Sequence, residues 1–477
     1  MPAYRAIALP ADAIFPLKAI EEVVEEAGVR EQRRRLLPAV AVMVFVLSCC
    51  LFSHDGYREA ARKVACWMEL VTGRAGWRVP GAPALARARR RLGPRPFELL
   101  FARLAGPLAG PGTPGATAFG RLLVAIDGST LEVPYSAANT DAFGSPPTGH
   151  GRGGYPQVRL VTMSGCGTRG LIAAGFGKAK GKGGGELTLA LQIAATGAPG
   201  PGTLVLADRV FCCYRLVAAL TGAHADVLIR AKSDQNLPVC QVLTDGSWLS
   251  VLPDPQAARL RSSLNCTRRR RGSTLGPDTS PLPGITIRVI EFTLTVTAPD
   301  GTRRSEPYRL ITSLLDPVQA PARQVAECYA QRWEAETGYR ELKAVLRGSG
   351  RILRSRDPDM VRQEVWAFLS ACQLIHAARA DAAEAAAEDL DPDRISYTVT
   401  LRAVRRQIPA GPHPDNRSTV IREVLSQLLP RRRQRNYPRL TRRSTAFRRE
   451  AATQRHGPVS YHITINIPAR TANQPGP

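Results

Sequence analysis

The chain has 477 residues and a formal net charge of +25 at pH 7, the charge balance expected of a protein that binds a polyanion. Its length is enough for roughly two to four domains. The ten cysteines include no C-x-x-C pair, so the sequence indicates neither a zinc module nor a disulfide scaffold. Reduced thiols in a cytosolic protein are therefore expected.

Residues 1–117 are predicted to form an all-helical domain. Residues 36–52 carry no charge, but a bilayer span needs about 20 apolar residues and this run contains Pro38, so we expect a buried helix and no membrane association. Residues 84–104 predict two helices separated by a Gly-Pro break. The arginines of the first of these helices are read either as part of a module that binds DNA ends or as a solvated surface. Residues 1–30 lack the apolar core of a secretory signal.

Two short apolar runs, residues 121–127 and 202–208, each end in an aspartate. Continuous apolar runs of this length are typical of strands that are covered on both faces. Asp127 and Asp208 are then presented at the end of a sheet, where α/β proteins commonly build their sites.

The segments around these runs predict the order strand, strand, strand, helix, strand, helix. The additional strands are expected at residues 129–134 and 156–163, and the helices at 185–196 and 211–220. A further strand over 226–232 places Arg230 and Lys232 outward, where they could contact the DNA backbone or form structural salt bridges.

The segment between the second aspartate and the helix described next is longer than one helix and one strand require. Period-two alternation predicts strands at residues 285–290 and 292–297, a turn at Asp300-Gly301 and a further strand from 308. Trp248, also within this segment, is expected to pack in the core.

Residues 328–348 read as one helix with no proline. At about 100° per residue, Tyr329, Arg332, Glu336 and Lys343 fall within a wedge of roughly 60°. An arginine and a lysine beside a glutamate could hold phosphates and a hard cation. The alternative is a solvated helix face with ordinary charge pairs.

The spacing Y-(2)-R-(3)-E-(6)-K resembles the signature of transposases of the insertion sequence 4 family, which are DDE enzymes. Together with Asp127 and Asp208 in the right order, the resemblance spans roughly residues 118–385. It implies a ribonuclease-H-like α/β core, and the predicted strand and helix order agrees with that fold. It also implies a β-rich insertion between the second aspartate and Glu336.

Three carboxylates suit phosphodiester chemistry with two magnesium ions, for which manganese can substitute. We assign Asp127 as the ligand that bridges both ions, with Asp208 and Glu336 each completing one. Tyr329, Arg332, Lys343, Arg230 and Lys232 are assigned to DNA.

The sequence therefore predicts a multi-domain protein. The expected regions are an N-terminal helical DNA-binding domain at 1–117, the catalytic core at 118–240 and 320–387, the β-rich insertion at 241–319, and a basic helical C-terminal region and tail at 388–477. Within the core region, a helix over 363–387 is expected to pack on the sheet.

The function implied is binding of the element's terminal inverted repeats, cleavage of the ends and strand transfer to target DNA, by a homodimer on double-stranded DNA in the bacterial cytoplasm. A ribonuclease-H-like nuclease or resolvase and a non-catalytic DNA-binding protein are the alternatives. The nuclease would rarely need the large insertion, and the binding protein has no use for three acids.

Overall fold

A computed structural model describes residues 14–33, 35–110, 112–146, 154–181, 183–270, 283–297, 301–386, 390–431 and 460–466. The chain divides into two compact units. The first contains residues 1–117, 122–199 and 333–432, and the second contains 118–121, 200–332 and 433–477. The predicted core region contributes to both units, so the division into four regions stays a prediction.

The helices of the first unit surround an apolar centre. In α2 every residue but Val40 is buried, which confirms the predicted buried helix, and no described helix is long and apolar enough to cross a membrane. The Gly-Pro break also separates two helices as predicted. The N-terminal helices are α1 (Leu17–Glu26), α2 (Ala39–Leu51), α3 (Tyr57–Lys63), α4 (Ala65–Thr72), α5 (Ala82–Leu92) and α6 (Arg95–Leu104).

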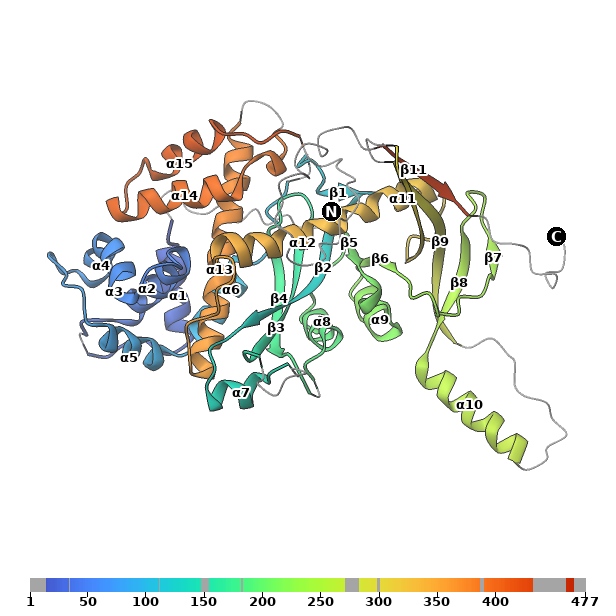
Figure 1. Cartoon of the computed structure of the whole chain (residues 1–477), viewed down its shortest axis with the longest axis horizontal. Helices are drawn as coiled ribbons and strands as arrows, with labels where there is room; N and C mark the ends of the chain where they lie inside the picture. Colours follow the sequence, from blue (N-terminus) through green and yellow to red (C-terminus); the bar gives the residue numbers. More distant parts are fainter. Residues whose placement is uncertain are drawn as a thin grey trace. The chain divides into compact units, whose positions relative to one another are not determined.

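The long helix α13 (Pro358–Glu384) was expected to pack on the sheet, and it does contact the sheet, although other helices make most of its contacts. It packs chiefly against α6 and α2, as Figure 1 shows, and it contacts the sheet at β4 (Leu171–Lys178), where the Trp366 ring lies against Phe176 and the Gln373 side chain accepts a hydrogen bond from Leu171. Side chains on most of the circumference of α13 are buried, including several polar ones, which is what a helix enclosed by other helices shows. The remaining C-terminal helices are η4 (Pro392–Arg394), α14 (Tyr397–Gln407), η5 (Ile408–Ala410) and α15 (Asn416–Leu425).

The strands of the first unit run in the order β4-β3-β2, with antiparallel neighbours. Strand β2 (Arg121–Glu132) continues five residues past Asp127, so the predicted second strand at 129–134 is the continuation of β2. Its ladder with β3 (Gln157–Gly165) pairs Asp127 with Thr162 and runs on to Glu132. A partner strand that is distant in sequence sets this length, and the apolar run alone does not reveal it.

Strand β4 was not predicted, because glycines are depleted in strands. Gly175 and Gly177 instead let the helix α8 (Glu186–Ala195) approach closely: a Cβ at Gly175 would lie 3.4 Å from the Ile193 side chain. With β4 included, the order β2, β3, β4, α8, β5, α9, β6 still reads three strands, helix, strand, helix. A short helix, α7 (Ala137–Phe143), lies between β2 and β3 in the chain.

The strands of the second unit run in the order β5-β6-β10-β9-β8-β7. Strands β5 and β6 are parallel and the other pairs are antiparallel. The elements are β5 (Thr203–Ala207), η1 (Arg209–Phe211), α9 (Tyr214–Gly222), β6 (Asp226–Arg230), β7 (Gln241–Val242), β8 (Trp248–Pro253), α10 (Pro255–Arg270), β9 (Gly284–Thr297), β10 (Arg303–Thr312), α11 (Ala322–Tyr329) and η2 (Ala330–Arg332).

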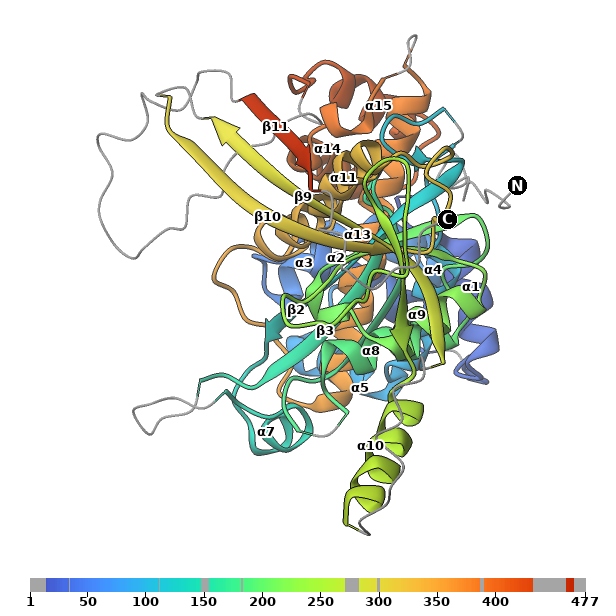
Figure 2. The same cartoon turned by 90° about the vertical axis from the view of Figure 1, so that its right-hand side faces the viewer.

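The expected hairpin is present in this unit, but β9 is one strand of fourteen residues, not two shorter ones. Of the predicted turn, Gly301 has a φ of +81° and Asp300 lies outside the described residues. Trp248 is buried, as expected. Strand β11 (Ser460–Ile465), from the predicted tail, pairs with β9 (Figure 2). Helix α10, also unpredicted, has no buried side chain over residues 255–267.

The helix predicted over residues 328–348 is not uniform. It consists of the end of α11, the 3-10 turn η2, the α-helix α12 (Trp333–Arg340) and the π-helical segment η3 (Glu341–Leu346). Each residue of a 3-10 turn rotates the chain further about the helix axis than a residue of an α-helix does, and each residue of a π-helix rotates it less. The wedge calculated for an ideal α-helix is therefore wrong as a description of all four side chains.

Candidate active site

Asp127 lies in the middle of β2, where the fully buried run Leu122–Ile126 gives way to half-buried residues. Its Oδ1 accepts a hydrogen bond of 2.9 Å from the Gly128 amide, and its main-chain oxygen accepts one of 2.8 Å from the Tyr339 hydroxyl. The Gly128 amide thus orients the carboxylate, and the Tyr339 hydroxyl attaches the main chain of Asp127 to helix α12.

Helix α12 and the π segment η3 are attached to β2 at two points. Besides the bond from Tyr339, Lys343 Nζ donates to Ser129 Oγ at 3.1 Å. Glu336 is half-buried and lies three residues before Tyr339, so it projects from α12 near the side that faces β2. Asp127 and Glu336 therefore stand on elements that are directly hydrogen-bonded to each other.

Burial controls the protonation of both attachment residues. It raises the pKa of Tyr339 far above its ordinary value, so the hydroxyl remains a donor. It lowers the pKa of Lys343, and the nearby Arg347 charge lowers it further. Lys343 therefore holds its proton less firmly than an exposed lysine does.

A second carboxylate adjoins this strand and was missed by the sequence analysis. Glu186, at the start of α8, lies against Gly128, where an added Cβ would be 2.5 Å from the Glu186 Cδ. Arg159 on β3 donates to Glu186 Oε1 at 2.5 Å. A larger residue at 128 would make the Glu186 side chain shift from this place beside Asp127.

In the second unit, Asp208 directly follows β5, as predicted. It caps η1, and its Oδ1 accepts a bond of 2.8 Å from the Val210 amide. Tyr329 donates its hydroxyl to the main-chain oxygen of Ala207 at 3.1 Å. Helix α11 is thereby held to the end of the strand that carries Asp208.

The expected DNA contact of Tyr329 does not fit its position, because the side chain is buried and its hydroxyl is engaged. Burial raises its pKa, with Arg332 and Arg230 opposing and Asp208 and Tyr308 adding to the rise. These side chains are therefore close enough to act on Tyr329 electrostatically, and the second unit groups Asp208, Tyr329, Arg332 and Arg230.

Arg230 is held by two neighbours that the sequence analysis did not identify. Its guanidinium lies over the Tyr308 ring, 4.1 Å from the centroid, and donates to Glu306 at 2.9 Å. The Tyr308 ring in turn stacks on Phe292, with centroids 5.1 Å apart. Lys232 is exposed and lies two residues beyond the end of β6. The sequence predicted either a DNA contact or a structural salt bridge for Arg230, and the salt bridge to Glu306 is present.

The units divide the predicted residues. Asp127, Glu336 and Lys343 belong to the first unit, and Asp208, Tyr329, Arg332, Arg230 and Lys232 belong to the second. Tyr308 and Arg159 have no motif that would reveal them, because strand pairing brings them to these positions.

The three predicted ligands are carboxylates, the oxygen donors that suit magnesium or manganese. Among the described residues, no group of three or more His, Cys, Asp or Glu side chains is close enough to hold a metal ion. The fit to a hard divalent cation thus rests on the carboxylate chemistry of the three predicted ligands, which include no thiolate or imidazole, and not on an observed cluster.

The chain is similar to several known proteins. Residues 11–102 match the model of the family described as insertion element 4 transposase N-terminal, and residues 118–374 match that of the transposase DDE domain. The chain is 27% identical over 431 residues to the transposase InsG for insertion sequence element IS4 of Escherichia coli strain K12, covering 89% of each protein. It also aligns with a solved piggyBac transposase synaptic complex with hairpin DNA, at a TM-score of 0.39 and 9% identity, over 89% of this chain and 84% of that one.

Proposed function

Because the chain belongs to the insertion element 4 family of DDE transposases, we propose that it binds the terminal inverted repeats of its own element, cuts the ends and joins them to target DNA. The enzyme is a DNA transposase, as predicted from the sequence. The observation that carries the proposal is that Glu336 projects from a helix whose Tyr339 is hydrogen-bonded to the main chain of Asp127.

We assign Asp127, Asp208 and Glu336 as the residues that would hold the divalent cations. The DDE-domain match over residues 118–374 includes all three positions. Two magnesium ions, or manganese in their place, would acidify the attacking oxygen and neutralise charge on the leaving oxygen. No protein side chain is then required as the general base. This assignment of a shared site rests on the sequence order and the family.

The basic side chains orient the DNA. Arg332 and Lys343 would hold phosphates, and Arg230 and Lys232 would contact the DNA backbone. For Arg230 a phosphate must compete with Glu306. Tyr329 holds α11 against β5 and acts on the site through that attachment.

The proposal includes a ribonuclease-H-like core, supported by the chain order β2, β3, β4, α8, β5, α9, β6. Strands β7 to β10 would be the β-rich insertion expected of the family. We further propose a homodimer on double-stranded DNA in the bacterial cytoplasm.

The test is cleavage of a labelled element end by Asp127→Ala, Asp208→Ala and Glu336→Ala, with gel-shift affinity measured on the same DNA. Each variant should lose several orders of magnitude in nicking, because a metal ligand is gone, while end binding stays near that of the parent protein. Asp359→Ala removes an exposed carboxylate that is paired with Arg362 and serves as the matched control.

Retained cleavage in any of the three variants would remove that residue from the site. The parent protein must also join the cut end to a second duplex. A nuclease or resolvase would nick without giving this product, and a non-catalytic binding protein would give neither product.

A further inference from the structure

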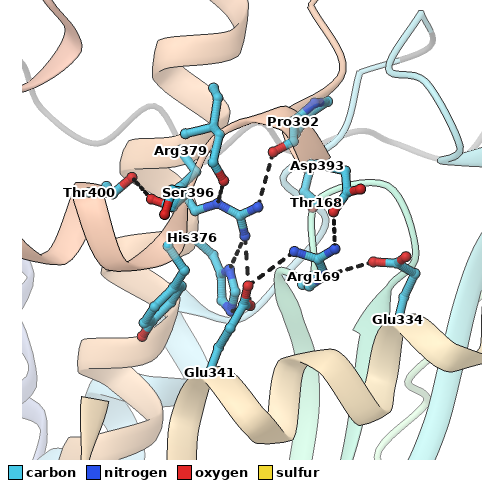
Figure 3. Close-up of polar contacts among 12 residues, drawn as sticks. Thr168, Arg169, Glu334, Glu341, His376, Arg379, Pro392, Asp393, Ser396 and Thr400 are labelled. Carbon is cyan, nitrogen blue, oxygen red and sulfur yellow. Dashed lines mark hydrogen bonds and ion pairs between the residues drawn. The ribbon is translucent and has the colours of Figure 1, made fainter. Parts of the chain in front are cut away.

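Arg169 is a buried arginine whose nitrogens each meet a different carboxylate (Figure 3). Nε donates to Glu334 at 2.6 Å, Nη1 donates to Glu341 at 3.1 Å, and Nη2 donates to Asp393. Glu334 and Glu341 stand on α12 and η3, and Asp393 stands on η4. One guanidinium therefore joins the helix that carries Glu336 to the C-terminal helices of the same unit.

The loop that presents Arg169 is itself tightly held. It connects β3 to β4, and Arg169 adopts a φ of +62°, with its amide donating to the Gly165 carbonyl at 2.8 Å. A Cβ at Gly167 would lie 2.6 Å from the Ala116 Cβ, and one at Gly170 would lie 2.8 Å from Leu108 side-chain atoms. The backbone therefore has little freedom to move Arg169 away from its partners.

Two further buried side chains, Arg379 and His376, lie close to Glu341. Arg379 Nη1 is 3.8 Å and His376 Nε2 is 3.9 Å from Glu341 Oε2. Arg379 also donates to the carbonyls of Ile395 and Pro392 at 3.1 and 3.0 Å. Arg169, Glu334, Glu341, Asp393, His376 and Arg379 form what we call the Arg169 cluster. With His376 neutral it holds three carboxylates and two guanidiniums.

The Arg169 cluster and β2 contact different sides of the same helix. Glu334 and Glu341 both bind the Arg169 guanidinium, so they lie on the same side of the helix. Glu336 and Tyr339 lie about 140–160° away from Glu334. Tyr339 is the residue that bonds to Asp127, so the face that bears Glu336 is turned toward β2 while the opposite face is tied to Arg169.

We infer that Arg169 is a positioning residue for Glu336. By binding Glu334 and Glu341, it sets the rotation of α12 about its axis and so directs the Glu336 carboxylate toward β2, the strand that carries Asp127. The inference rests on the proposed role of Glu336 as a metal ligand. A lysine has one ammonium and cannot make three planar contacts, so the arrangement requires arginine specifically.

The test compares Arg169→Lys with Arg89→Lys in the full-length protein bound to an element end that cannot be cleaved. Arg89 is the matched control, because it is also buried in the first unit, but its hydrogen bonds run to Gln363, Tyr57, Ser355 and Met360, which lie outside α12. Free Mn²⁺ is measured by electron paramagnetic resonance during a titration, and the thermal unfolding midpoint is recorded for each variant without metal.

We expect Arg169→Lys to weaken Mn²⁺ binding about 10–100-fold, the effect typical of residues that orient a ligand, and to raise the Mg²⁺ concentration needed for half-maximal cleavage in parallel. End binding should be retained. Arg89→Lys should lower the unfolding midpoint without altering Mn²⁺ affinity. If Arg169→Lys does not fold, Glu334→Gln, which removes one charge with little change of shape, should give a smaller loss in the same direction.

An Arg169→Lys protein that unfolds earlier but binds Mn²⁺ like the parent protein overturns the inference, because the cluster would then be only structural. For Glu334→Gln, unchanged Mn²⁺ affinity has the same meaning. Glu336→Ala separates this outcome from failure of the proposed function: if that variant still binds Mn²⁺ and cuts, Glu336 is not a ligand at all.

Discussion

Arg332 and Lys343 are proposed to neutralise phosphates, and each is only half-buried. Replacing either by Ala should weaken binding to element ends and reduce the slope of log K against log salt by about one, because one fewer counterion is released per lost phosphate contact. Affinity is measured by fluorescence anisotropy at several salt concentrations. Mn²⁺ affinity should barely change.

Arg323→Ala is the control for this pair. Arg323 is exposed on α11 and bridges to Glu327 at 3.2 Å, so its loss should leave the slope unchanged. If Arg332→Ala and Lys343→Ala both keep the parent slope, the two residues belong to an ordinary helix surface.

His376 links stability to pH. Burial lowers its pKa well below 6.5, and the nearby charges of Arg379 and Arg169 lower it further. Below pH 6.5 the His376 imidazole binds a proton in the unfolded chain, whereas it stays neutral in the folded protein. The free energy of unfolding should thus be intact above that pH and should fall, on acidification, by up to about 1.4 kcal/mol per pH unit.

The measurement is urea unfolding between pH 7.5 and 5.5, for the parent protein, His376→Gln and His413→Gln. His376→Gln should flatten the decline, since the titrating group is gone. The exposed His413 serves as control, and its replacement should leave the decline as it was. An identical slope in all three proteins would show that another group governs the acid sensitivity.

At the scale of elements, replacing two glycines by alanine should change the free energy of unfolding in opposite directions. At Gly338, in α12, an added Cβ meets nothing within 4 Å, so Gly338→Ala should raise the free energy of unfolding by about 0.5–1 kcal/mol through helix propensity. At Gly128 the same change drives Glu186 away from its place beside Arg159. Gly128→Ala should cost up to about 1 kcal/mol, the worth of a partly exposed ion pair, and should reduce cleavage, because Asp127 is the preceding residue.

Denaturant unfolding and end cleavage of the two variants check both expectations. A stable and fully active Gly128→Ala protein would mean that Glu186 can move without disturbing Asp127. A Gly338→Ala protein that is less stable would mean that α12 does not follow ordinary helix energetics at this position.

At the scale of the whole molecule, the chemistry should depend on a hard divalent cation. Preassembled complexes with element ends, dialysed into each cation, should cut with Mg²⁺ or Mn²⁺. Ca²⁺ should support assembly without cutting, because its larger radius and looser coordination spoil the in-line geometry. Full activity in EDTA would rule out carboxylate-bound metal and the roles of Asp127, Asp208 and Glu336 together.

The sequence by itself determined the family and the helices and strands that depend on local pattern. The resemblance to insertion sequence 4 transposases, drawn from the Y-(2)-R-(3)-E-(6)-K spacing, is confirmed by matches across residues 11–102 and 118–374. The buried helix α2, the Gly-Pro break, the β5 strand before Asp208 and the β9–β10 hairpin could be predicted because apolar runs, breakers and turn residues act over a few positions.

Tertiary structure decided what depends on partners that are distant in the chain. The length of β2 comes from its ladder with β3, and β4 exists despite its glycines because α8 needs their space. Tyr329 was assigned to DNA from spacing alone, but packing on Ala207 buries it. Arg169 reaches carboxylates 165, 172 and 224 residues away in sequence, and no local pattern can encode such a meeting. Burial makes those contacts necessary for stability, because a charged group that is removed from water without a partner costs free energy.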